Sequence, residues 1–213
     1  MPTQAVIFDL GKVLLDFDYT IAARKFLPLC RAPLQTIVHL INQSPLLHRL
    51  ETGLISSQAF FDEVQAATGF QGSWPEFRTI FGDIFSPIQP MVRLHAELRA
   101  RPLHTYIFSN TNDLAVTHIR DHFPFFRQFD GYVYSYEHHA MKPESILYEI
   151  METTSGCQGA ELLYIDDRRE NLAAGAARGW RTVLHQTPEK TRAAIVQLGL
   201  LDGKMKSIND FGA

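Results

Sequence analysis

Five short runs of mostly consecutive apolar residues constrain the fold of this chain more than any other feature of its sequence. They span residues 5–8, 105–108, 132–134, 162–165 and 182–184. Because the runs do not alternate between apolar and polar residues, both faces of each strand should be buried. A parallel sheet that is covered by helices on both faces requires this pattern. We therefore predict five strands of such a sheet.

Segments with helical spacing lie between the later strands. The first segment has Met91, Leu94, His95 and Leu98 at helical spacing. The second has Ile146, Leu147, Ile150 and Met151, and the third spans residues 171–178. The third segment ends at Gly179, a common helix stop. Strands that alternate with helices indicate right-handed crossovers. The expected fold is α/β, a doubly wound, Rossmann-like parallel sheet in a three-layer sandwich.

The connection between the first and second strands is far longer than one crossover needs. From about Asp18 to Phe85 the apolar residues keep helical spacing, and Ser56 or Ser57 can cap one of the helices. A structureless loop of this length is uncommon in a compact domain. This segment is therefore predicted to be an all-helical cap domain inserted into the α/β core.

The predicted domain boundaries follow from this insertion. The α/β core takes residues 1–17 and 86–213, and the helical cap takes residues 18–85. Within the core, residues 188–201 should form a closing helix, and residues 203–213 should form a loose tail.

Composition excludes several classes of protein. The 213 residues are 46% hydrophobic and 20% charged, as in a globular protein, and the formal charge of -3 argues against a nucleic-acid binder. No apolar run approaches the ~20 residues that span a bilayer, and the N-terminus lacks the cationic stretch of a secretory signal. The two cysteines are too few for a disulfide framework. We expect a cytoplasmic protein with no membrane partner, either a monomer or a homodimer.

Polar residues follow three of the predicted strands. Asp9 follows the first strand, Ser109 the second, and Asp166 with Asp167 the fourth. In open α/β sheets, ligands bind beyond the carboxyl ends of the strands, so these side chains should converge on one edge. Each of them could instead cap the following helix. Their coincidence at one edge favours a functional site.

The chemistry of this edge points to phosphoryl transfer. The three carboxylates form a cluster of oxygen ligands that suits Mg²⁺ and would repel one another without a cation. Lys142 can face an anionic substrate, and Ser109 with the backbone N–H groups of Asn110 and Thr111 can hold anionic oxygens. A carboxylate nucleophile, a divalent cation, a lysine and hydrogen-bond donors together suit an aspartyl-phosphate mechanism.

The sequence resembles the haloacid dehalogenase superfamily, particularly phosphatases with a helical cap of the C1 type. Four segments carry the resemblance along nearly the whole chain: Phe8–Leu14, Phe108–Thr111, Lys142–Pro143 and Asp166–Asn171. The resemblance implies a Mg²⁺-dependent phosphoric monoester hydrolase that acts on a small phosphorylated metabolite.

The resemblance also implies a role for each matching residue. Asp9 would attack phosphorus, Ser109 and Asn110 would bind phosphoryl oxygens, and Lys142 would neutralise charge. The metal would be held by Asp9, by the backbone carbonyl of Gly11, by Asp167, and by Asp166 either directly or through a water molecule. Asn171 would brace the last of these loops.

Gly11 departs from the usual motif of this superfamily. A second aspartate normally stands two residues after the nucleophile and acts as general acid and then as general base. A bacterial group of sugar-1-phosphate phosphatases resembles this sequence closely, with the same Asp-Leu-Gly at the nucleophile and similar residues around Glu51–Gly53. His139 is a second departure, because relatives often carry glycine there, and an exposed loop explains His138 and His139 better than catalysis does.

Two other functions remain open at this point. A metal-independent 2-haloacid dehalogenase would use Asp9 on carbon, although it would not need the Asp166–Asp167 pair. A weakly catalytic phospho-ligand sensor would explain Gly11. The natural substrate depends on the cap, where His48, Arg49 and Trp74 are candidate contacts, although a solvated polar face or a packed aromatic side chain explains each of them better.

Overall fold

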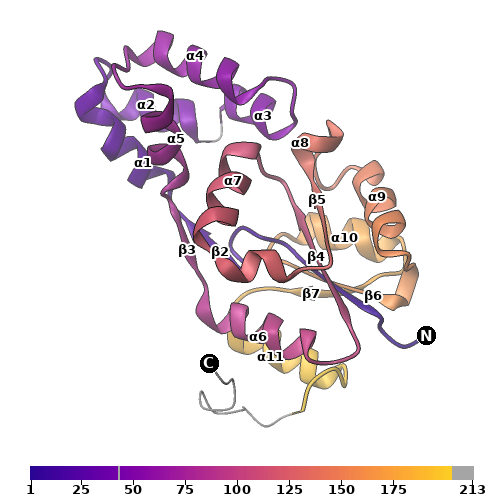
Figure 1. The fold of residues 1–213 in the computed structure, drawn as a ribbon. Coiled ribbons are helices and arrows are strands. Elements are labelled where there is room, and N and C mark those ends of the chain that lie inside the picture. Colours follow the sequence, from indigo (N-terminus) through magenta and orange to yellow (C-terminus); the bar gives the residue numbers. More distant parts are fainter. Residues whose placement is uncertain (43, 203–213) are drawn as a thin grey trace.

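The computed structural model describes residues 1–42 and 44–202, so the expected tail at 203–213 lies outside the described residues. The predicted α/β architecture is confirmed, with five parallel strands in the order β5-β4-β1-β6-β7 (Figure 1). These strands are β1 (Ala5–Phe8), β4 (His104–Ser109), β5 (Gly131–Tyr134), β6 (Leu162–Asp166) and β7 (Arg181–Leu184). Central β1 pairs with β4 and β6, so its carboxyl end meets theirs at one edge.

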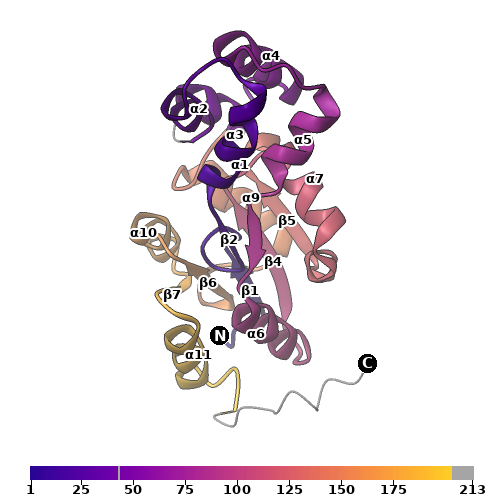
Figure 2. The same cartoon turned by 90° about the vertical axis from the view of Figure 1, so that its left-hand side faces the viewer.

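Helices cover both faces of the sheet, which explains the continuous apolar runs. Val6 and Phe8 belong to a hydrophobic cluster with residues of α6, α7 and α11, whereas Ala5 and Ile7 pack with residues of α9 and α10. The bounds are α6 (Gln89–Arg99), α7 (Asp113–His122), α9 (Ser145–Ser155), α10 (Arg169–Ala177) and α11 (Pro188–Gln197). Figure 2 shows α6 beside α11 and away from the helical insertion. Side chains that alternate along one strand thus enter two different cores.

Short elements complete the core. They are the helix α8 (Ser135–His138) and the 3₁₀ turns η2 (Pro124–Gln128) and η3 (Gly159–Glu161). Helix α8 follows the carboxyl end of β5 and stops at His139, whose φ of 53° is left-handed. Glycine adopts this conformation at no steric cost, whereas a residue with a side chain, such as His139, rarely does.

In its described residues, 18–42 and 44–85, the long connection folds as five α-helices and one 3₁₀ turn above the carboxyl edge of the sheet (Figure 1). They are α1 (Tyr19–Phe26), η1 (Leu27–Leu29), α2 (Leu34–Ile41), α3 (Pro45–Glu51), α4 (Ser57–Thr68) and α5 (Trp74–Gly82). We call them the helical insert. Asp18 caps α1 by accepting a hydrogen bond from the backbone of Thr20, and Ser56 caps α4.

Two short strands join the insert to the core. β2 (Leu15–Phe17) and β3 (Phe85–Pro87) pair antiparallel, with Phe17 opposite Phe85. This two-stranded connection is absent from the sequence-based expectation. It carries the chain out of the core and back at neighbouring positions, so both covalent connections of the insert run through one pair of strands.

The insert has its own aromatic core. Phe77 lies at its centre, with ring centroids of Phe26 at 5.0 Å, Phe61 at 5.1 Å and Trp74 at 6.0 Å. Aromatic pairs at these separations contribute both buried area and ring–ring attraction. Trp74 is therefore a packed side chain of this core.

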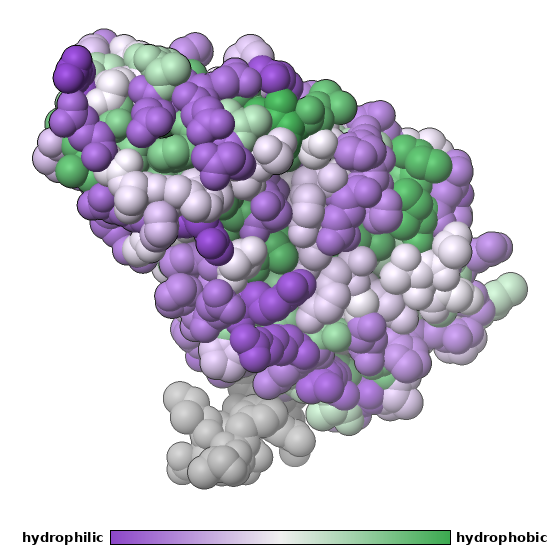
Figure 3. Space-filling view, turned by 45° about the horizontal axis from the view of Figure 1, so that its top comes forward, coloured by the Kyte–Doolittle hydropathy of each residue, from purple (hydrophilic) through white to green (hydrophobic). Residues whose placement is uncertain are grey.

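The described helices include none with the length and apolar character needed to cross a bilayer. On the face drawn in Figure 3, hydrophilic residues predominate and apolar residues gather in separate patches.

Candidate active site

Asp9 stands at the carboxyl end of the central strand, where the order of the sheet reverses. Its backbone N–H donates to Ile165 O at 2.9 Å, which continues the pairing of β1 with β6 by one residue. The N–H of Leu10 donates to Asp9 Oδ1 at 2.7 Å and orients the carboxylate. Ligand sites of open α/β sheets form at such switch points.

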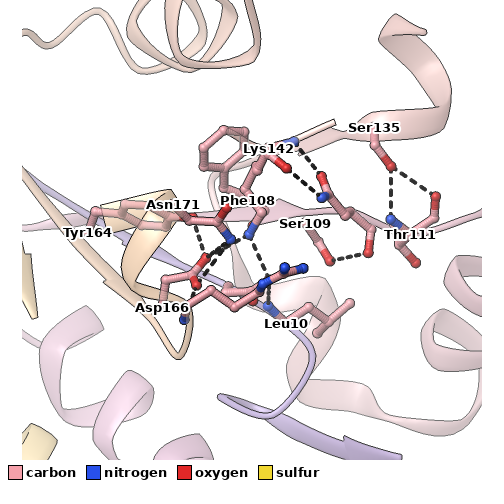
Figure 4. Close-up of polar contacts among 12 residues, drawn as sticks. Leu10, Phe108, Ser109, Thr111, Ser135, Lys142, Tyr164, Asp166 and Asn171 are labelled. Atoms are coloured by element: carbon pink, nitrogen blue, oxygen red, sulfur yellow. Dashed lines mark hydrogen bonds and ion pairs between the residues drawn. The ribbon is translucent and has the colours of Figure 1, made fainter. Parts of the chain in front are cut away.

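Lys142 joins Asp9 to the neighbouring carboxylate. Its Nζ lies 3.0 Å from Asp9 Oδ1 and 2.8 Å from Asp166 Oδ2, and it also donates to Phe108 O at 2.8 Å (Figure 4). The lysine side chain is 1% exposed. Although burial lowers it, Asp9 and Asp166 together hold the pKa of Lys142 above its ordinary value. Lys142 is therefore a fixed positive charge beside the proposed nucleophile.

Asp166 is fully enclosed by hydrogen-bond donors. Oδ2 accepts from Lys142, from the hydroxyl of Tyr164 and from Asn171 Nδ2, while Oδ1 accepts from the backbone N–H of Arg168 at 2.7 Å (Figure 4). Although burial raises it, Lys142 and these hydrogen bonds hold the pKa of Asp166 below its usual range. With its oxygens so engaged, Asp166 is better suited to orient its neighbours than to be a metal ligand in direct contact.

Asn171 braces this loop by donating from Nδ2 to both oxygens of Asp166, at 3.1 and 3.2 Å. Its Oδ1 is buried and has no partner among the described residues. Tyr164 is a residue of this site that the sequence pattern does not reveal, because it lies within the apolar run of β6 and such a run predicts a core position.

Asp167 completes a cluster of oxygen ligands. One carboxylate oxygen from each of Asp9, Asp166 and Asp167 lies within 4.8 Å of the others. Burial raises the pKa of Asp9 to about 7, with the other two carboxylates adding to the shift and Lys142 opposing it. Burial and then Asp166 also raise the pKa of Asp167. Three carboxylates against one ammonium group leave an excess of negative charge, and this donor set fits Mg²⁺.

Ser109 and Asn110 end β4 beside this cluster, but the two side chains have different surroundings. Ser109 is buried, and its hydroxyl makes one long hydrogen bond, 3.4 Å to Asn110 O. The Asn110 side chain binds the backbone of Lys142 twice, accepting from its N–H at 2.8 Å and donating to its carbonyl at 3.1 Å. The Asn110 amide therefore positions Lys142, and its backbone N–H is the donor left for a phosphoryl oxygen.

The expectation for Thr111 is wrong. Its backbone N–H donates to Ser135 Oγ at 2.9 Å and so is not free to hold an anionic oxygen. Ser135 in turn donates to Glu51 O at 2.6 Å, which links the core to the insert. The sequence holds no signal for this contact, because the two residues are 84 positions apart.

Gly11 lacks a side chain where the usual motif has an acid, and a neighbouring ring takes up the space. A Cβ at position 11 would lie 2.8 Å from Phe17 Cε1. Phe17 is held by Phe85 at a centroid distance of 6.1 Å and by Tyr19 at 5.8 Å. The aromatic ring of β2 therefore stands where a larger residue at position 11 would need room.

A cavity of about 260 Å³ lies over the carboxylate cluster, is lined by both the core and the insert, and is partly open to solvent. From the core, its lining includes Asp9, Gly11, Ser109, Asn110, Lys142, Asp167 and Asn171. From the insert, its lining includes Tyr19, Asn42, Leu47 and Glu51. His48, Arg49 and Trp74 are not among the described residues that line it. A larger, open hollow of about 590 Å³ around Arg99 and His104 contains none of the carboxylates.

Comparisons with known proteins agree with this architecture, although no family model matches the chain. A D-ribitol-5-phosphate phosphatase of Bacteroides thetaiotaomicron is 24% identical over 184 residues, covering 83% of this chain and 89% of that protein. A haloacid dehalogenase family enzyme of the same bacterium, in complex with magnesium and inorganic phosphate, has a TM-score of 0.75 at 22% identity, covering 86% of this chain and 94% of that one.

An L-2-haloacid dehalogenase of Xanthobacter autotrophicus, with chloropropionic acid covalently bound, is less similar. Its TM-score is 0.63 at 18% identity, covering 92% of this chain and 83% of that one. The strand order, the helical insert and the four motif segments are thus all in place. This chain has the fold of the haloacid dehalogenase family enzymes.

Proposed function

We propose that this chain is a Mg²⁺-dependent phosphatase of a small phosphorylated sugar or polyol, with Asp9 as the nucleophile. One observation carries the proposal. The buried pair of Asp9 and Lys142 lies beside Asp166 and Asp167, at a cavity that the core and the insert line together. A nucleophilic carboxylate, a fixed ammonium group and a cation site in one enclosed space suit the attack on a phosphate monoester.

Two relatives support the reaction class. The Bacteroides protein is a phosphatase of D-ribitol 5-phosphate, and the superposed enzyme of the same bacterium binds magnesium and inorganic phosphate. The cavity volume of about 260 Å³ favours a small metabolite over a macromolecular phosphoester.

Each residue of the site has a separate role in the proposed reaction. Asp9 Oδ1 is held by Lys142 and by the N–H of Leu10, which leaves Oδ2 without a hydrogen bond from the described residues and able to attack phosphorus. Lys142 offsets charge on the phosphoryl group, and Ser109 donates to one of its oxygens. Mg²⁺ would be held by Asp9, the Gly11 carbonyl and Asp167, with Asp166 orienting the site; when bound, it supplies positive charge that favours ionised Asp9.

The insert shields one side of the cavity from solvent and sets selectivity. Tyr19, Asn42 and Leu47 line the cavity opposite the carboxylates and are placed to contact the part of the substrate beyond phosphorus. Enclosure strengthens electrostatic interactions with the reacting group.

The test is hydrolysis of p-nitrophenyl phosphate with Mg²⁺ and with EDTA, beside chloride release from a 2-haloacid. We expect phosphate release only with Mg²⁺, and none from Asp9→Asn, because a carboxamide cannot form the acyl-phosphate. The exposed Asp121→Asn is the matched control and should keep wild-type rates. Metal-independent chloride release without phosphatase activity would replace the proposal by a dehalogenase. A panel of phosphorylated polyols and sugars then identifies the substrate class.

A further inference from the structure

The proposed phosphatase reaction needs a proton donor that the core does not provide at the usual place. The alcohol of a sugar or polyol is a poor leaving group unless it is protonated as it departs. Gly11 has no side chain, and the Phe17 ring stands 2.8 Å from where its Cβ would be. The donor must therefore come from another residue that reaches the same space.

Glu51 reaches this space from the insert. It is the last residue of α3, and it lines the cavity of about 260 Å³ together with Asp9. It also lines a smaller hollow of about 50 Å³ that adjoins Gly11, Phe17 and Ser109. Both hollows include Gly11 and Glu51 among their lining residues. Glu51 thus lines the space beside Gly11 together with the proposed nucleophile, and its carboxyl group interacts electrostatically with Tyr19, which lines both hollows.

The backbone around Glu51 is fixed to the core. Ser135 Oγ donates to Glu51 O at 2.6 Å, and His139 Nδ1 lies 3.1 Å from Thr52 O, to which it can donate only as the Nδ1–H form. Gly53, at a φ of +66°, sits so close to the carbonyl of Tyr136 that a Cβ there would lie 2.1 Å from its oxygen. The segment that carries Glu51 is therefore held against α8, which positions the carboxyl group relative to the site.

The Glu51 carboxyl group is chemically free for this role. Among the described residues it accepts no hydrogen bond and forms no ion pair, unlike Asp9 and Asp166. Burial raises its pKa to about 7, so the protonated and ionised forms are both available near neutral pH. A group that gives and then takes a proton works best in this range.

The other charged or titratable side chains that line the two hollows are less suited to donate this proton. In the described part of the chain they are Asp9, Lys12, Tyr19, Lys142, Asp167 and Arg168. Each cation among them is paired with a carboxylate. Asp9 is the proposed nucleophile and Asp167 a proposed metal ligand. Burial, with Glu51 as the second cause, raises the pKa of Tyr19 and keeps that phenol neutral.

We propose that Glu51 is the general acid and base of this site and replaces the side chain that Gly11 lacks. The inference rests on the proposed phosphatase function. As the Asp9 Oδ–phosphorus bond forms and the ester P–O bond breaks, the Glu51 carboxyl gives its proton to the departing oxygen and releases the alcohol. Water then attacks phosphorus, its proton passes to the Glu51 carboxylate, and the Asp9–phosphorus bond breaks to release phosphate. Each cycle restores both carboxyl groups.

The test compares Glu51→Gln with wild type on esters of graded leaving-group acidity. For sugar or polyol phosphates, kcat/KM should fall by about 10²–10⁴-fold, the usual contribution of a general acid. For p-nitrophenyl phosphate it should fall by less than roughly fivefold, because this leaving group needs little protonation. Since the variant also lacks the base for the second step, it should release a stoichiometric burst of p-nitrophenolate followed by slow turnover.

Controls separate this role from folding or binding. Glu63→Gln changes an exposed glutamate of α4 in the same insert and should leave every ester at its wild-type rate. Glu51→Asp keeps a carboxyl group on a shorter side chain, so its losses should be smaller than those of Glu51→Gln on poor leaving groups. Equal losses of Glu51→Gln on all esters, or no loss, would overturn the inference and leave the phosphatase standing. Wild type that hydrolyses no phosphate ester with Mg²⁺ would overturn the proposed function itself.

Discussion

Lys142 bridges two carboxylates that would repel each other more strongly without it. Its ammonium group lies between Asp9 and Asp166, with almost no contact with solvent. A buried charge of this kind costs free energy to desolvate, and that cost is offset only while its partners are present. The same contacts that orient the proposed nucleophile therefore also affect the stability of the fold.

Lys142→Met should lower the free energy of unfolding by about 3–5 kcal/mol in EDTA, because it leaves two buried carboxylates without their cation. Urea unfolding of the variant and of wild type measures the difference. Lys190→Met, at an exposed position of α11, should change stability by no more than about 0.5 kcal/mol. Equal stability of Lys142→Met and wild type would contradict the role of the ion pair in the fold.

The raised pKa of Glu51 predicts that the stability of the folded chain depends on pH. Burial raises its pKa from 4.5 to about 7, so between these values the folded chain holds a proton that the unfolded chain has lost. Stability therefore falls as pH rises through this window. Glu51→Gln removes the fall, and the variant should match wild type near pH 4 but melt at a higher temperature near pH 8. Thermal melts in EDTA measure this; Glu63→Gln should show no such gain at pH 8.

Among the secondary-structure elements, α8 holds the segment of the insert that carries Glu51 against the core. Ser135, at its start, is fully buried and connects Thr111 with Glu51, and His139, at its end, contacts Thr52. Ser57 at the start of α4 adds a hydrogen bond to Asp113 of α7. The insert is thus attached to the core at α7 and α8 as well as through the β2–β3 pair.

Ser135→Ala should destabilise the chain by about 1–3 kcal/mol, because the Thr111 N–H would lose its only partner in the described residues and remain buried. It should also raise KM for the substrate, since the segment that carries Glu51 would be held less firmly. Denaturant unfolding and steady-state kinetics test the two effects together. The exposed Ser86→Ala of β3 is the matched control, and a variant that loses neither stability nor affinity would contradict the attachment.

Sequence patterns predicted those elements that depend on neighbouring residues. The five strands, the helices between them and the polar residues at the strand ends all follow from local hydrophobic spacing. The β2–β3 pair could not be predicted, because each strand has three residues and pairs with a segment about 70 positions away. The contacts of Asn110, Thr111 and Glu51 were missed for the same reason, since they depend on how distant segments pack.

For the whole molecule, the excess negative charge at the site predicts a response to metal. Mg²⁺ that binds only the folded state, at 100 times its Kd, adds about 2.7 kcal/mol. In a chain of this size that raises the melting temperature by roughly 5–10 °C. Asp167→Asn should lose most of this rise, yet be at least as stable as wild type in EDTA, because it removes one repelling carboxylate.

Differential scanning calorimetry with and without Mg²⁺ measures both effects. Asp121→Asn, on the exposed side of α7, should respond to Mg²⁺ as wild type does. An undiminished rise in Asp167→Asn would place the metal elsewhere.

The separate aromatic core of the insert has a consequence for how such a chain tolerates change. Residues around Phe77 pack among themselves, whereas the strands pack with their own helices, and Phe85 of β3 is packed against both groups. A substitution that alters the volume around Phe77 is taken up first by rings within the insert, whereas the hydrogen-bond partners of Asp9 belong to the core. The sequence of the insert, which lines the substrate side of the cavity, and the sequence of the core, which carries the reacting groups, can therefore diverge at different rates.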